Sequence, residues 1–275
     1  YGALPAAFIA TLTAPIVALV HHPLGLEEGL SAPEGRRLLK SEAEALAAAA
    51  HIVVPSRAMS QTLQELFFVS PAKITIAKPG ILRGKRSSGA PAGQPLHIVS
   101  AGAITPRKGF GILADALHAV RDLDWHATIA GSLERSPKTA AEVQKKLARY
   151  ALTDRVRLAG TLDEDGVSAL YSSGDVFALA SLYEGYGMAF AEAMAHGLPV
   201  VASGGGAVAD TVPKQAGFIC APDDAEGIAN ALRLLLTDAA LRRQKAHAAW
   251  QHARTLPDWP ETAAIILDVL KRSAK

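Results

Sequence analysis

Cysteine is nearly absent from this sequence: one thiol, Cys220, ends the apolar run 217–220. A single thiol cannot support a disulfide framework, so a reducing compartment suits the chain. Its apolar neighbours favour a buried structural role over a nucleophile or a metal ligand. Clusters of His and Asp at metal-ligand spacing are also missing around the glycine-rich loops considered below, so we expect no metal requirement.

Long apolar runs are scarce too. The stretch from Pro5 to Val20 is broken by Pro15 and is too short for a membrane helix, which needs about 20 apolar residues. This stretch predicts a helix followed by a buried strand. No basic segment followed by a small-residue cleavage site marks a signal peptide. Because residue 1 is Tyr rather than Met, we expect the chain to begin partway through a longer protein.

The sequence also lacks an excess of one charge: it contains 28 Lys and Arg residues and 26 Asp and Glu residues. The first 94 residues hold 9 basic and 6 acidic residues, which leaves 19 and 20 for the remainder. This bias is too weak to indicate a nucleic-acid binder, and no nucleic-acid partner is expected. A hydrophobic content of 49% is typical of a globular protein, and 275 residues favour two domains.

Short β-branched runs alternate with helical patterns along the whole chain. In the first part we expect strands at 16–20, 52–54 and 73–77, with helices at 34–50 and 56–68. Beyond it we expect strands near 96–101, 126–130, 155–159, 176–180, 199–202 and 217–220, helices between them, and a last helix at 259–272. Such alternation predicts an α/β fold with parallel sheets that bind ligands at the carboxyl ends of their strands.

A segment rich in Gly, Ser, Pro and charge at 83–94 has the composition of a linker. We therefore predict a domain over residues 1–82 and a second, nucleotide-binding domain over 95–257. Residues 258–275 are predicted to form a helix that packs back toward the first domain.

The strand at 96–101 leads into a glycine-bounded loop, Gly102 to Gly109, which contains Arg107 and Lys108 just before a predicted helix. The unpaired amides and the dipole at a helix start favour an anion, and the two cations would strengthen that preference. A solvated Arg-Lys pair is the alternative. A P-loop is excluded because no Gly-Lys-Ser or Gly-Lys-Thr occurs here.

The strand at 176–180 leads into a second loop that contains Glu184, Gly185 and Gly187, and a helix that contains Glu192. The glycines allow the backbone to approach a ligand closely, and the first helical amides would face phosphate. Two carboxylates facing one diphosphate would be costly, so each is predicted to bind hydroxyls. Glu184 as a helix cap and Glu192 as a solvated side chain remain possible.

Taken in order, these segments resemble a known family. The two glutamates around Gly-Tyr-Gly-Met, followed by Ala-Met-Ala-His-Gly-Leu-Pro-Val-Val-Ala-Ser, are similar to the glutamate motif of glycosyltransferase family 4. These are retaining enzymes of the GT-B fold, in which two Rossmann-like, doubly wound domains flank a cleft. The resemblance is close over residues 96–240. It implies an incomplete first domain here, because only about 80 residues precede the linker.

The resemblance implies roles for individual residues. Arg107 and Lys108 would hold the donor diphosphate and stabilise the leaving group, next to Gly102. Glu184 and the backbone amides of Gly185, Tyr186, Gly187 and Met188 would meet the donor sugar, and Glu192 would bind the ribose. Gly160 and Thr161 match the position that contacts the base. His21 or His22, after the first strand, would line the cleft near the reacting sugar as a catalytic group.

The function that the resemblance implies is transfer of a hexose, with retention, from a nucleoside diphosphate sugar to a hydroxyl of a glycan, a lipid or a small molecule. Such enzymes build polysaccharide or glycolipid in the cytoplasm, in some cases peripherally at the inner membrane face, and need no cofactor. Alternatives that stay open are a sugar-nucleotide epimerase, a phosphorylase that uses pyridoxal phosphate, and a non-catalytic nucleotide-binding module.

Overall fold

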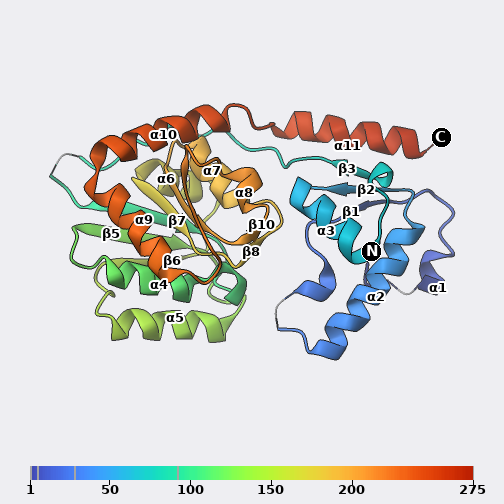
Figure 1. The fold of residues 1–275 in the computed structure, drawn as a ribbon, viewed down its shortest axis with the longest axis horizontal. Helices are drawn as coiled ribbons and strands as arrows, with labels where there is room; N and C mark the ends of the chain where they lie inside the picture. The colour runs from blue at the N-terminus through green and yellow to red at the C-terminus, as the bar shows by residue number, and fades with distance from the viewer. Residues whose placement is uncertain (1, 5, 28, 92, 275) are drawn as a thin grey trace. The chain divides into compact units, whose positions relative to one another are not determined.

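The computed structural model describes residues 2–4, 6–27, 29–91 and 93–274. These form two compact units: Tyr1–Gly80 with Pro257–Lys275, and Ile81–Leu256. Figure 1 shows the course of the chain through both. The principal helices are α2 (Ala32–Ala48), α3 (Arg57–Phe67), α4 (Phe110–Ala119), α5 (Pro137–Arg149), α6 (Glu164–Ser173), α7 (Met188–Ala195), α9 (Ala225–Thr237), α10 (Ala239–Ala253) and α11 (Trp259–Ser273), with the short helices α1 (Ala6–Ile9) and α8 (Val208–Thr211).

The first unit contains a three-stranded parallel sheet in the order β1 (Val17–Leu19), β2 (His51–Val54), β3 (Ile74–Ile76). Helix α11 belongs to this unit, where Val269 packs with Val53 and Thr262 donates a hydrogen bond to the Lys78 carbonyl at 2.7 Å. Strand β1 lies at the edge of the sheet and Leu19 is 55% exposed. The apolar run at 16–20 predicts a strand covered on both faces, and that prediction was wrong: Ala18 is buried on one face, whereas Leu19 is exposed on the other.

The second unit contains a six-stranded parallel sheet in the order β11 (Gly217–Cys220), β9 (Val200–Ser203), β7 (Val176–Leu179), β4 (Leu96–Ala101), β5 (Trp125–Ala130), β6 (Val156–Gly160). Helices α4, α5 and α9 cover one face and α6, α7 and α10 the other (Figure 1). If these six strands are renumbered by their order in the chain, from β4 as 1 to β11 as 6, the sheet reads 3-2-1-4-5-6 from the β6 edge. This is the strand order of a doubly wound dinucleotide-binding domain. The α/β prediction with Rossmann-like units is confirmed.

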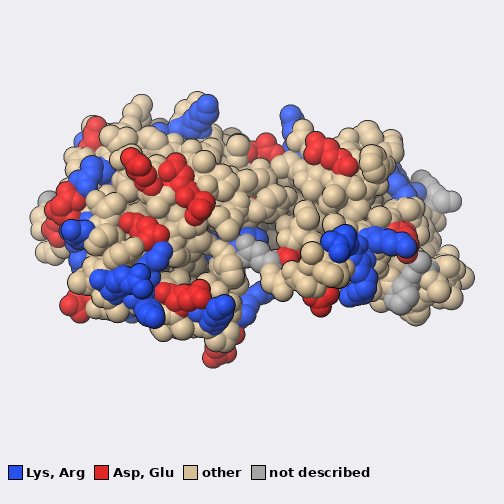
Figure 2. Space-filling view, turned by 60° about the horizontal axis from the view of Figure 1, so that its bottom comes forward, with Lys and Arg blue, Asp and Glu red and all other residues tan. Residues whose placement is uncertain are grey.

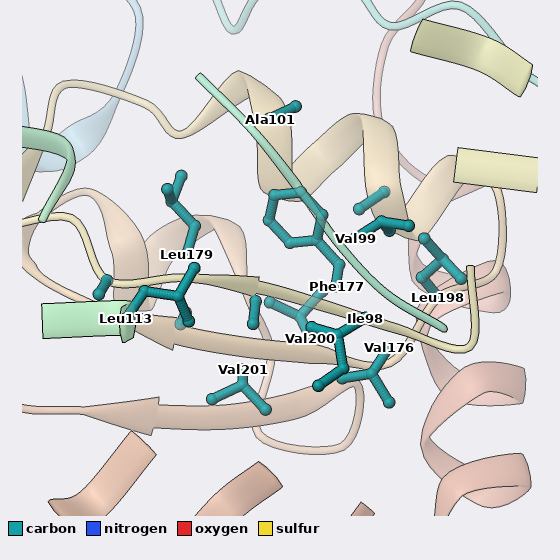
Figure 3. Close-up of a cluster of buried hydrophobic side chains, with 14 of the residues drawn as sticks. Ile98, Val99, Ala101, Leu113, Val176, Phe177, Leu179, Leu198, Val200 and Val201 are labelled. Atoms are coloured by element: carbon teal, nitrogen blue, oxygen red, sulfur yellow. The ribbon is translucent and has the colours of Figure 1, made fainter. Parts of the chain in front are cut away.

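The core of this unit forms where the central strands are buried on both faces. Figure 3 shows Ile98 and Val99 of β4 beside Val176 and Phe177 of β7. Each of these four side chains is at most 1% exposed. Continuous β-branched and aromatic runs suit strands sandwiched between two helix layers, because neither face meets water. This rigid core fixes the ends of β4 and β7, from which the candidate site is built.

The chain passes from the first unit to the second between Gly80 and Ile81, earlier than the predicted linker at 83–94. Residues of that segment are hydrogen-bonded to the second unit: the Ser87 amide donates to the His196 carbonyl at 2.8 Å and the Ala90 amide to Asp175 at 2.9 Å. Ala92 lies outside the described residues. These bonds hold a polar, glycine-rich segment that has no regular secondary structure against the folded unit.

The surface carries charges of both signs. In Figure 2, Lys and Arg lie among Asp and Glu on the face in view, as the small net charge predicts. None of the described helices is both long and apolar enough to cross a membrane. Cys220 is half-buried at the end of β11, and burial raises the pKa of its thiol to about 11, which disfavours a nucleophilic thiolate.

Candidate active site

The candidate site lies where the sheet of the second unit reverses its strand order. Strands β4 and β7 are neighbours in the sheet although β5 and β6 come between them in the sequence. The chain therefore leaves β4 and β7 toward opposite sides, which opens a crevice at their carboxyl ends. The glycine-bounded loop follows β4 and the glutamate motif follows β7, so the fold brings the two predicted segments together.

Gly109 allows the two loops to pack closely. Its backbone is left-handed (φ 60°), and a Cβ at this position would overlap the carbonyl oxygen of Ala180, just after β7. The Leu182 amide also donates a hydrogen bond to the Arg107 carbonyl at 2.8 Å. The short 3₁₀ turn Pro106–Lys108 is thereby fixed directly against the chain that follows β7.

Glu184 is the most heavily bonded side chain of the site. It lies in the short strand β8 (Tyr183–Glu184), which pairs with β10 (Gly205–Gly206), and it is 5% exposed. Oε1 accepts hydrogen bonds from Lys108 Nζ and Ser181 Oγ, both at 2.6 Å, and Arg107 lies 3.6 Å from Oε2. Two cations and a hydroxyl thus compensate the buried carboxylate.

Arg107 and Lys108 are both partly open to solvent, with side-chain exposures of 29% and 15%. The Arg107 guanidinium donates one hydrogen bond, from NH1 to the Tyr183 carbonyl at 2.9 Å. Guanidinium and ammonium groups carry five and three N–H donors respectively. Both cations therefore keep donor capacity for an anion while they bind protein oxygens. Because they bring two positive charges against the one negative charge of Glu184, the cluster has a net positive charge.

Helix α7 begins beside this cluster without a side-chain cap. Its N-cap residue, Gly187, has φ 93° and, as a glycine, offers no side chain to cap the helix. Unpaired amides at a helix start favour a negatively charged group. The cations after β4 and the start of α7 are therefore the candidate elements for binding an anion.

Glu192 lies in the second turn of α7 and has different surroundings. Its Oε2 accepts a hydrogen bond from the Tyr171 hydroxyl at 3.1 Å. Burial raises the pKa of the Glu192 carboxyl, and the negative charge of Glu164 adds to this, whereas the Tyr171 hydrogen bond and the charge of Lys108 lower it. Glu192 is therefore electrostatically coupled to Lys108 and to Glu164, the first residue of α6.

The other predicted donor-site residues occupy neighbouring strand ends. Gly102 follows β4, with its amide bonded to the Ala130 carbonyl at 2.9 Å. Gly160 ends β6 in a left-handed conformation (φ 70°), and exposed Thr161 follows it. Gly185 and Met188 are partly buried, whereas Tyr186 is only 6% exposed. The Tyr186 ring belongs to the core, so its backbone is the part left for ligand contact.

His21 and His22 follow β1 in the first unit, whereas the residues above belong to the second. His21 is exposed and His22 is partly buried. Their place beside the donor sugar, like the individual donor contacts, stays a prediction.

The sequence predicts no role for two polar residues of the site, Ser181 and Tyr171. Ser181 is fully buried and donates a hydrogen bond to Glu184, which follows it by three positions. The one sequence feature that could have indicated this role is a serine directly after an apolar strand. Tyr171, on α6, is 21 positions from Glu192, and nothing in the sequence spacing connects the two. His196, predicted only as part of the motif, packs against the Tyr171 ring at 5.2 Å between centroids.

Comparison with known proteins matches this arrangement. The family model described as "Glycosyl transferases group 1" matches residues 95–238, which contain both loops and both glutamates. The chain belongs to this family of glycosyl transferases. A second model, "Glycosyltransferase Family 4", matches residues 1–82. The resemblance to glycosyltransferase family 4 is thus confirmed.

Curated relatives of this chain include the glycogen synthase of Mycobacterium tuberculosis, 30% identical over 79% of this chain and 53% of the relative. The MMP alpha-(1->4)-mannosyltransferase of Mycolicibacterium hassiacum is 24% identical over 96% of this chain and 67% of the relative. The match covers 53% of the glycogen synthase, so this chain spans about half the length of that relative.

Solved structures show that this chain has the GT-B fold. Sucrose-phosphate synthase from Thermosynechococcus elongatus superposes with a TM-score of 0.85 at 22% identity, covering 97% of this chain and 69% of that chain. Anabaena HepE in complex with UDP-glucose gives a TM-score of 0.80 at 21% identity, covering 94% and 72%. The predicted fold class is confirmed.

Proposed function

We propose that this chain is the donor-binding part of a retaining glycosyltransferase that moves a hexose from a nucleoside diphosphate sugar to an acceptor hydroxyl. The observation that carries the proposal is the cluster at the switch point of the sheet, where Arg107 and Lys108 pair with Glu184, three positions before the N-cap residue of α7. A diphosphate has the charge and the oxygen acceptors that such a site favours.

In the proposed reaction the bond between the anomeric carbon and the diphosphate breaks while that carbon bonds to the acceptor oxygen, and the acceptor hydroxyl gives its proton to the departing diphosphate. Negative charge then develops on the departing diphosphate. Cations and amides that are already fixed in place can stabilise that charge without reorganising. In this scheme Arg107 and Lys108 are catalytic and donor-binding residues.

Further donor contacts in the proposal follow the family pattern. Glu184 would accept from sugar hydroxyls and Glu192 from the ribose, while Gly160 and Thr161 would contact the base. His21 or His22 would act as a catalytic group near the reacting sugar. The proposal needs no metal, because the two cations supply the positive charge that the leaving group requires; activity unchanged by EDTA would support this part.

The solved relative HepE is bound to UDP-glucose, which supports a nucleotide sugar as the donor class. Any membrane contact in the proposal is peripheral, through basic residues of the first 94 positions. Binding to vesicles of anionic lipid that is abolished by salt would support that contact.

Titration calorimetry against UDP, GDP and ADP tests the donor site. One nucleotide is expected to bind, and the double variant Arg107→Ala, Lys108→Ala should lose that binding. Lys146→Ala is the matched control, since it breaks another Lys–carboxylate pair of the same unit, with Asp115 at 2.7 Å. No binding to any of the three nucleotides would contradict the proposal.

A screen of labelled sugar nucleotides against glycan, lipid and small-molecule acceptors tests the reaction. Product with retained anomeric configuration and released diphosphate are expected. Nucleotide binding without transfer to any acceptor would favour a non-catalytic binding module instead.

A further inference from the structure

The two carboxylate oxygens of Glu192 are not equivalent. Oε2 accepts the hydrogen bond from Tyr171 at 3.1 Å, whereas none of the side chains or amides that the structure describes donates a hydrogen bond to Oε1. Glu192 is half-buried in a unit where Glu184, at the other end of the same motif, has several donors. Oε1 of Glu192 therefore has acceptor capacity that the described residues do not use.

Tyr171 is held so firmly that its hydroxyl has a fixed position. The side chain is 1% exposed, and its ring packs against Phe177 at 5.8 Å and His196 at 5.2 Å between centroids. His196 is itself fixed, because Nδ1 lies 2.9 Å from the Glu192 carbonyl and Nε2 lies 3.1 Å from Ser168 Oγ. Since a carbonyl only accepts, Nδ1 donates and Nε2 accepts from the serine.

Besides burial, three neighbouring groups affect the pKa of Glu192. Lys108 approaches from the loop after β4, Glu164 from the start of α6, and Tyr171 from later in α6. Burial raises the pKa of the Tyr171 hydroxyl well above its ordinary value. Tyr171 therefore stays protonated near neutral pH and acts toward the carboxylate as a donor.

We propose that Tyr171 is a positioning residue for ribose recognition: it binds Oε2 of Glu192 and thereby directs Oε1 to accept a hydrogen bond from a ribose hydroxyl. This inference rests on the proposed function, in which Glu192 meets the ribose. Groups that orient a ligand-binding carboxylate change affinity by about 10- to 100-fold in comparable sites, where metal ligands are the measured case. Because Tyr171 acts through Glu192, its effect should depend on the ribose hydroxyls.

The substitution Tyr171→Phe tests this, because it removes the hydroxyl and keeps the packed ring. Calorimetry would compare the nucleotide that the unaltered chain binds with its counterpart that lacks both ribose hydroxyls. We expect the variant to bind the ribonucleotide about tenfold more weakly and the deoxygenated counterpart equally well. Equal weakening of both ligands would overturn the proposal, since it would indicate a merely structural role.

Tyr150→Phe is the matched control. Tyr150 also donates to a carboxylate, Asp115, at 2.6 Å, but that pair joins α5 to α4 away from Glu192. Its removal should leave the preference for ribose hydroxyls unchanged. The same loss of preference in this variant would contradict a specific role for Tyr171.

A second measurement needs no nucleotide. The Tyr171 hydrogen bond lowers the pKa of Glu192, so Tyr171→Phe should raise that pKa further, as followed by carboxyl carbon NMR. An unchanged pKa would overturn the positioning contact. Failure of the unaltered chain to bind any nucleotide would instead overturn the proposed function, whereas binding with an unchanged ribose preference in Tyr171→Phe would overturn the role of Tyr171 alone.

Discussion

The two glutamates of one sequence motif lie in opposite electrostatic surroundings. Glu184 is 5% exposed and contacts Lys108, Ser181 and Arg107. Glu192, eight positions later, is half-buried and has the Tyr171 hydroxyl as its hydrogen-bond donor among the described residues. The carboxylate of Glu184 is thus stabilised mainly by cations, whereas the carboxylate of Glu192 accepts its hydrogen bond from a neutral hydroxyl.

The difference indicates that Glu184, besides its proposed contact with the sugar hydroxyls, has a larger structural role than Glu192. Glu184 joins the loop after β4 to the loop after β7 and fixes the cations that would meet phosphate. Glu192 contributes less to holding these loops together and keeps an oxygen for a ligand. Substitutions at Glu184 and its partners should therefore affect stability and binding together, whereas those at Glu192 should mainly affect binding and the pH dependence.

The largest effect is expected for Lys108→Ala. The substitution leaves Glu184 buried without its nearest cation, and breaking a buried pair costs about 3 kcal/mol or more of unfolding free energy. Urea denaturation measures the loss. The double variant Lys108→Met, Glu184→Gln removes both charges and should recover much of that stability without restoring nucleotide binding. A double variant as unstable as Lys108→Ala would contradict this account.

A smaller loss is expected for Ser181→Ala. The fully buried hydroxyl donates to Glu184 at 2.6 Å, and losing a hydrogen bond to a buried charged group costs about 1.5–3 kcal/mol. Urea denaturation checks this as well. Ser173→Ala is a control, because its hydroxyl contacts the Leu170 carbonyl and Nδ1 of His97 but no carboxylate. Equal losses in both variants would show that the charge of Glu184 is unimportant.

Arg107→Ala should cost about 1 kcal/mol of stability or less, because the side chain is 29% exposed and lies 3.6 Å from the carboxylate, so solvent screens the pair. Its effect on nucleotide affinity should be larger than its effect on stability. Parallel calorimetry and denaturation separate the two. A stability loss as large as that of Lys108→Ala would make Arg107 a main structural partner of Glu184.

The smallest effect concerns pH and Glu192. Burial raises its pKa above the ordinary value of 4.5, so the folded state binds the proton more tightly than the unfolded state. Stability should therefore fall as pH rises from about 4.5 through the raised pKa, and Glu192→Gln should abolish that contribution. Denaturation across this pH range measures it. An unaltered pH profile in the variant would contradict a raised pKa.

Much of the fold can be predicted from the local pattern of apolar residues and glycines in the sequence. The β4 strand has the predicted bounds, and β7 differs from its predicted range by a single residue, because continuous apolar runs between glycine-rich turns leave little choice of structure. The edge position of β1 was not readable, since an apolar run does not reveal how many neighbours a strand has.

The sequence by itself determined the family, the parallel α/β architecture and the two loops that carry Arg107, Lys108, Glu184 and Glu192. These depend on local composition, strand periodicity and motif order. Only the tertiary structure decided how the two glutamates differ. Lys108 and Glu184 are 76 positions apart, and Tyr171 and Glu192 are 21 apart. Such pairs form because a parallel sheet brings the ends of non-consecutive strands and helices together, and that proximity leaves no trace in local spacing.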